Sequence, residues 1–120
     1  MKKTLVLGAS PNPQRYAYIA TKRLLAKGHE VVLVGVRKDA MIDGIAIQTG
    51  QPTVNDVDTV TLYLNSTRQE AYYDYIISLK PKRIIFNPGT ENTELMRLAK
   101  INNIESVVAC TLVMLSTDQY

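Results

Sequence analysis

The chain has 120 residues, of which 46% are hydrophobic and 21% charged, so length and composition predict one soluble globular domain over residues 1–120. Its apolar runs are too short for a secretion signal or for the roughly 18 residues of a membrane span, so we expect no membrane association. Its single cysteine excludes an internal disulfide, which fits a reducing compartment, and we expect a cytoplasmic protein. The net charge is +3, with eight of the fourteen Lys and Arg residues in residues 1–40, which suits a small phosphorylated ligand, whereas no nucleic-acid-binding motif is present.

In the first half of the chain, the sequence predicts one helix with a strand before it and two strands after it. Residues 4–9 are aliphatic on both faces, which is typical of a central strand in a parallel sheet. Residues 16–27 have apolar positions at helical spacing. Residues 30–36 form a second buried strand, and a short strand is expected at residues 45–47 within an otherwise irregular stretch.

In the second half of the chain, predicted strands alternate with predicted helices. Strands are expected over residues 59–64, 83–87 and 106–110, and helices over residues 67–79 and 92–102. Thr67 and Glu70 have the spacing of a capping box. Residues 112–115 are compatible with a strand extension, a turn of helix or an interface segment. The alternation predicts an α/β fold with one doubly wound, mainly parallel sheet of five to six strands and helices on both faces.

In such a sheet, ligands bind outside the carboxyl ends of the strands. Four loops begin at predicted strand ends, and each contains small or polar residues. The candidate ligand-binding residues from these loops are Gly8, Ala9, Ser10, Pro13, Arg15, Gly35, Val36, Arg37, Lys38, Asn65, Ser66, Asn87, Pro88, Gly89 and Asn92.

The first of these loops has the features of an anion site. Gly8 and Ala9 would let a ligand approach the backbone, and Pro13 stiffens the turn. Ser10 offers a hydroxyl that could cap a helix, and Arg15 can form a forked contact with phosphate beside the free amides of the next helix. The alternative is a strand-to-helix turn in which Gly and Pro serve conformation only.

The second loop discriminates between nucleotide ligands. NAD sites typically place Asp or Glu at the end of the second strand, where it bonds the ribose 2′-hydroxyl. Here Gly35-Val36 leads into Arg37-Lys38, and two cations favour a ribose phosphate instead. This disfavours NAD and leaves coenzyme A or NADP. The alternative is a solvated basic pair at the mouth of a loop.

The sequence resembles the small stand-alone CoA-binding proteins, which are related to the CoA-binding domain of the succinyl-CoA synthetase α subunit. The residues that carry the likeness are Gly8-Ala9-Ser10 with Pro13 and Arg15, residues 27–31, Gly44, residues 87–92 and Cys110. Residues 34–37 depart from the family's V-N-P element, and residues 63–65 depart from its F-R element. The resemblance implies a Rossmann-like fold, with diphosphate at the first loop, adenosine near the second and third, and pantetheine past the fourth.

Side chains suited to catalysis are scarce. His29 is expected in a turn at the amino end of a strand, opposite the ligand edge, and Cys110 is expected to be a buried small hydrophobe. Glu91 and Glu94 fit the first turn of a helix, and no Cys/His cluster has metal-ligand spacing. The tyrosines at helix and strand spacing are expected to pack, with a homodimer interface as one location for them.

These observations leave three hypotheses open. The first is a module that binds CoA or an acyl-CoA without evident catalytic machinery of its own. The second is an NADP-dependent reductase, or another nucleotide-using enzyme on the same scaffold, with Tyr63 as the proton donor. The third is a protein that has lost its ligand and keeps the fold for an interaction. We favour the first.

Overall fold

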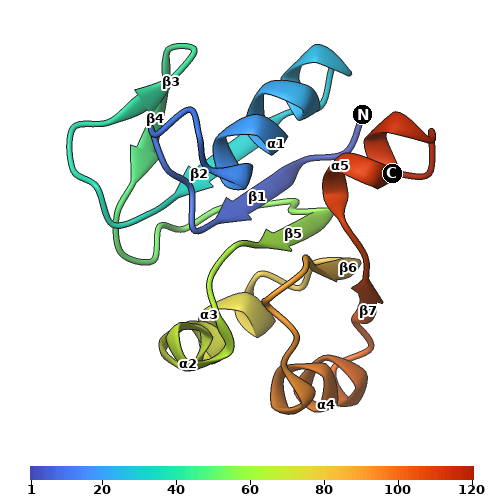
Figure 1. Cartoon of the computed structure of the whole chain (residues 1–120). Helices are drawn as coiled ribbons and strands as arrows, with labels where there is room; N and C mark the ends of the chain where they lie inside the picture. The colour runs from blue at the N-terminus through green and yellow to red at the C-terminus, as the bar shows by residue number, and fades with distance from the viewer.

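One sheet of seven strands, in the order β3-β4-β2-β1-β5-β6-β7, organises the molecule in a computed structural model that describes residues 1–120 (Figure 1). The strands are β1 (Thr4–Leu7), β2 (Val31–Val34), β3 (Met41–Ile42), β4 (Ile45–Gln48), β5 (Thr59–Leu62), β6 (Arg83–Phe86) and β7 (Glu105–Val108). All neighbouring strands are parallel except β3 and β4. The predicted doubly wound, mainly parallel sheet is therefore confirmed.

The predicted number of strands was too low, because the two-residue strand β3 was missed. It pairs with β4 as a hairpin, closed by Asp43 and Gly44. Both turn residues have positive φ, at 51° and 80°, as the tight type I′ hairpin turn requires. The Asp-Gly pair was the sequence signal for this hairpin, and β3 is too short to show any periodicity of its own.

Helices cover both faces of the sheet. The helices are α1 (Tyr16–Ala26), α2 (Ser66–Gln69), α3 (Tyr73–Ser78), α4 (Thr93–Ile101) and α5 (Thr111–Ser116), with the 3-10 turn η1 (Glu70–Tyr72) between α2 and α3. Helices α1 and α5 share one face, and α3 and α4 contribute to the hydrophobic cluster on the other. None of the helices combines the length and apolarity that crossing a bilayer requires.

Strand β1 shows why a doubly apolar run marks the centre of the sheet. Leu5 and Leu7 belong to the cluster on the α3–α4 face, and Val6 belongs to the cluster on the α1–α5 face. All four residues of β1 are buried. Because side chains alternate along a strand, burial on both faces favours apolar residues, as at Leu5, Val6 and Leu7. The polar Thr4 is buried at the amino end of the strand, where its hydroxyl shares a hydrogen bond with the Tyr120 hydroxyl.

The helix predicted over residues 67–79 is interrupted. Asn65, not Thr67, caps its first segment, since the Asn65 side chain accepts a hydrogen bond from the Arg68 amide at 2.9 Å; the capping-box prediction was wrong. The interruption at η1 coincides with the buried Gln69, whose amide donates to the carbonyl oxygens of Leu64 and Thr90, each at 2.8 Å. These bonds tie α2 to the loop after β6.

The remaining sequence-based expectations are resolved in the C-terminal part. Residues 111–116 form helix α5, so the turn-of-helix interpretation of residues 112–115 is the correct one.

The prediction that the tyrosines pack is confirmed: Tyr75 is buried, and Tyr72 and Tyr73 pack against the same core cluster. A homodimer stays a prediction. Cys110 is half-buried rather than buried, at the N-cap position of α5.

His29 lies beside the C-terminal Tyr120, at the amino end of the sheet. The two rings are 4.9 Å apart, and His29 Nδ1 accepts a hydrogen bond from the Lys2 amide at 3.0 Å. Burial, followed by the charges of Lys2, the N-terminal amine and Arg83, lowers the pKa of His29 below 6.5. The neutral imidazole is therefore the form that the fold favours.

The lowered pKa of His29 makes stability depend on pH. Because the folded value lies below the unfolded one, the stabilisation is present above pH 6.5 and is lost as the pH falls through the lowered pKa. We expect urea unfolding between about pH 8 and pH 5 to show this loss in the parent protein and a smaller one in His29→Gln. Equal pH dependence in both proteins would contradict the expectation.

Candidate ligand-binding site

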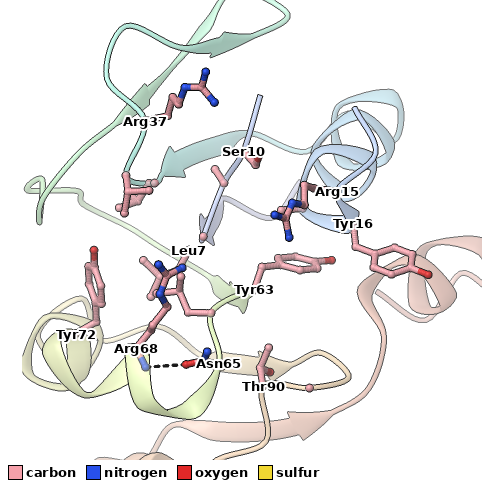
Figure 2. A pocket seen from close by; sticks show the side chains of 18 of the residues that line it. Leu7, Ser10, Arg15, Tyr16, Arg37, Tyr63, Asn65, Arg68, Tyr72 and Thr90 are labelled. Carbon is pink, nitrogen blue, oxygen red and sulfur yellow. Dashed lines mark hydrogen bonds between the residues drawn. The ribbon is translucent and has the colours of Figure 1, made fainter. Parts of the chain in front are cut away.

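A pocket of about 530 Å³ opens at the carboxyl edge of the sheet. Its wall is built from the loops after β1, β2, β5 and β6, from the start of α1, and from α2 and η1 (Figure 2). All four loops singled out in the sequence therefore meet in one place. The volume lies within the range of about 300–1,000 Å³ that is usual for small-molecule and cofactor sites.

Two thirds of the predicted binding residues line this pocket. They are Gly8, Ala9, Ser10, Arg15, Gly35, Val36, Arg37, Asn65, Pro88 and Gly89. The residues that do not line it are Pro13, Lys38, Ser66, Asn87 and Asn92. The lining residues that were not among the ligand-binding candidates are Leu7, Pro11, Tyr16, Ala17, Val34, Tyr63, Leu64, Arg68, Tyr72 and Thr90, of which only Tyr63 had been considered, as the proton donor of the reductase hypothesis.

The loop between β1 and α1 is held by its own short side chains. Ser10 Oγ accepts a hydrogen bond from the Asn12 amide at 3.1 Å, and Asn12 Oδ1 accepts one from the Gln14 amide at 3.0 Å. Ser10 does not cap α1; the N-cap residue is Arg15, and its side chain makes no capping hydrogen bond. With no acidic residue in the first turn either, the amides at the start of α1 keep their positive potential for a ligand.

Two glycines that line the pocket allow neighbouring loops to approach each other closely. Gly8 has φ of +99°, and a Cβ there would lie 3.0 Å from the backbone of Tyr63. A Cβ on Gly35 would overlap the carbonyl oxygen of Ala9. These positions let the loops after β1, β2 and β5 pack against one another, so the absent side chains make room for protein backbone. That Gly8 also lets a ligand approach the backbone stays a prediction.

Three arginines give the pocket its charge. Arg15, Arg37 and Arg68 line it, and none of them forms an ion pair or a side-chain hydrogen bond within the protein. No Asp or Glu is among the lining residues. An uncompensated guanidinium fits an anion that arrives with the ligand, phosphate above all. Arg68 was missed because it lies inside a predicted helix, although that helix begins at a strand end.

Two asparagines predicted to bind ligand are engaged in the fold. Asn87 is buried; its amide donates to Thr61 Oγ1 and to the Leu62 carbonyl, and its Oδ1 accepts from the Thr111 amide at 2.8 Å. Asn92 caps α4 by accepting from the Leu95 amide at 3.1 Å. These side chains connect β5, β6 and the helices behind the pocket, which explains why neither reaches its surface.

Groups suited to proton transfer are sparse in the pocket. Burial raises the pKa of Tyr63 to about 12, so its hydroxyl is a weak acid at neutral pH. His29 precedes β2 and thus lies at the opposite edge of the sheet, as predicted. No group of three or more His, Cys, Asp or Glu side chains comes together as a metal site.

The doubly wound sheet and the cationic pocket at its carboxyl edge define a Rossmann-like ligand-binding domain. The chain belongs to the CoA binding domain family, whose model matches residues 2–116. The resemblance inferred from the sequence is thereby confirmed. No curated protein matches the chain.

Solved structures of similar proteins share the whole fold. An uncharacterized protein is 54% identical, with a TM-score of 0.96 over 100% of this chain and 98% of its own. A conserved hypothetical protein from Pyrococcus furiosus is 29% identical, with a TM-score of 0.81 over 94% of this chain and 98% of its own. A hypothetical protein from Pyrococcus horikoshii is 27% identical, with a TM-score of 0.82 over 97% of this chain and 82% of its own.

Proposed function

We propose that this protein binds coenzyme A, or an acyl-CoA, in the pocket at the carboxyl edge of the sheet. The observation that carries the proposal is the set of three unpaired arginines around an open pocket without a carboxylate. Membership of the CoA binding domain family supports the same ligand. CoA carries a diphosphate and a ribose phosphate, so its charge complements that of the pocket.

The diphosphate is placed at the start of α1. There the uncapped amides of the first turn and the Arg15 guanidinium come from the same short segment, and a diphosphate can accept from both. The hydrogen bonds of Ser10 and Asn12 hold the loop in this conformation. A loop that is already ordered loses less entropy on binding.

An NADP-dependent reductase is the second candidate function, because NADP also carries a phosphorylated adenosine ribose. It requires a proton donor near the nicotinamide, and Tyr63 is the candidate within the pocket. The pKa of Tyr63, raised to about 12 by burial, makes that hydroxyl a poor donor. Titration calorimetry with CoA and NADPH side by side separates the two candidates: CoA is expected to bind more tightly.

Arg15→Ala is expected to weaken CoA binding by about tenfold or more, since a hydrogen bond to a charged group contributes about 1.5–3 kcal/mol. The measurement is a calorimetric titration, backed by the shift in melting temperature with CoA. Arg23→Ala is the matched control, because Arg23 is an exposed arginine on the same helix and lies outside the pocket. No binding of CoA by the parent protein at millimolar concentration would overturn the proposal.

A further inference from the structure

Arg68 enters the pocket from a wall that sequence reasoning did not assign to a cation. It lies in α2, and its amide is fixed by the Asn65 cap at 2.9 Å. Figure 2 shows its side chain rising from α2 into the space between Tyr72 and Tyr63. Because no carboxylate lines the pocket, this guanidinium has no partner of its own within it.

Tyr72 lies on the same wall, one turn beyond Arg68. Its ring is half-buried against the core and packs edge-on against Tyr75, with centroids 6.4 Å apart and an angle of 61° between the planes. This packing fixes the plane of the ring while part of it still lines the pocket. An aromatic ring of fixed orientation can stack on a flat aromatic group of a ligand, while the neighbouring guanidinium binds an anion attached to that group.

The opposite wall comes from the loop after β2. Arg37 and Val36 line the pocket there, and Val36 is 75% exposed, so its apolar surface is open to a ligand. Lys38, the other cation predicted for a ribose phosphate, does not line the pocket. Figure 2 places Arg37 across the pocket from Arg68. The second cation for such a phosphate is therefore missing from the loop after β2.

We propose that Arg68 supplies this second cation and determines specificity for a phosphorylated ribose, with Tyr72 as the surface on which the adenine base stacks. The inference rests on the proposed function and assigns one end of the ligand to one part of the pocket. A ribose phosphate binds between Arg37 and Arg68, one guanidinium from each wall. The diphosphate stays with Arg15, so that each anionic group of the ligand meets a cation.

The test compares ligands that differ only in the ribose phosphate. CoA and 3′-dephospho-CoA are titrated into the parent protein, Arg68→Ala, Arg68→Lys and the control Arg23→Ala. In Arg68→Ala we expect CoA to bind about tenfold or more weakly, while 3′-dephospho-CoA stays within about twofold, because only CoA loses a charge-assisted bond. Arg68→Lys is expected to recover part of the loss, since it keeps the charge but not the fork.

Tyr72 is tested by variants that separate the ring from its hydroxyl. Tyr72→Phe is expected to bind both ligands as the parent does, whereas Tyr72→Leu weakens both alike, because the base is common to them. Thermal denaturation without ligand checks that Tyr72→Leu is folded. Equal affinity of Tyr72→Leu and the parent for both ligands would remove the stacking role.

The two proposals fail in different ways. If Arg68→Ala weakens both ligands equally, or neither, the assignment of Arg68 to the ribose phosphate is wrong, while CoA binding stands. If the parent protein binds neither ligand, the proposed function is wrong. In that case adenosine 3′,5′-bisphosphate and AMP, titrated by NMR, still test the phosphorylated-ribose site: tighter binding of the bisphosphate that depends on Arg68 supports it, and equal or absent binding overturns it.

Discussion

Asn87→Ala is expected to lower the free energy of unfolding by about 2–3 kcal/mol, because the buried Thr111 amide loses its acceptor and the Leu62 carbonyl loses a donor. Thr61 Oγ1 keeps its hydrogen bond to Thr111 Oγ1 at 2.8 Å, which limits the loss. Urea denaturation measures the change. The effect is that of a structural side chain, although its position after β6 first suggested a ligand contact.

Asn55→Ala is the matched control for Asn87→Ala. Asn55 is exposed and its side chain makes no hydrogen bond within the protein, so the variant is expected to stay within about 0.5 kcal/mol of the parent. The structural assignment of Asn87 is wrong if Asn87→Ala is as stable as Asn55→Ala. If Asn87→Ala were as stable as Asn55→Ala but bound CoA markedly more weakly, Asn87 would instead be assigned a role in ligand binding.

Gly35→Ala is expected to destabilise the protein by about 1–3 kcal/mol and to weaken ligand binding as well. The added methyl group overlaps the Ala9 carbonyl oxygen and lies 3.0 Å from Cγ2 of Ile47. Since a backbone atom cannot rotate away as a flexible side chain can, the loop after β1 must move. That loop carries the phosphate-binding segment, so CoA affinity and the urea midpoint should fall together.

Gly44→Ala provides the comparison for Gly35→Ala. A Cβ at Gly44 meets no atom within 4 Å, but the residue has φ of +80°, so the variant bears only backbone strain of about 1–2 kcal/mol. Its CoA affinity is expected to equal that of the parent, because the β3–β4 turn lies away from the pocket. Parent-like stability and affinity in Gly35→Ala would show that the loops after β1 and β2 separate at little cost.

Most of the fold was predictable because the central strands of the sheet have a clear apolar pattern in the sequence. The doubly apolar β1 and β2 and the spacing of helices between strands predict a parallel sheet whatever the loops contain. The interruption of the helix over residues 67–79 was not predictable from periodicity. It directly follows Gln69, whose buried amide bonds to Leu64 and Thr90, and a contact as distant in the chain as the one with Thr90 leaves no local pattern in the sequence.

The site was predictable in its location more than in its chemistry. Topology places the carboxyl ends of parallel strands at one edge, so Arg15 and Arg37 were found from loop positions alone. Whether a polar residue at such a loop faces the pocket or the interior depends on packing. Asn87 and Asn92 turn inward, and Arg68, one turn into a helix, turns outward to the pocket.

The position of the chain ends has a practical consequence. Lys2 Nζ donates to the Tyr120 carbonyl oxygen, and Figure 1 shows both ends together on the side of the molecule away from the carboxyl ends of β1 and β2. An affinity tag or fluorescent reporter joined at either end is therefore kept clear of the pocket mouth. A protein immobilised through either end on a biosensor surface presents that mouth to the solution.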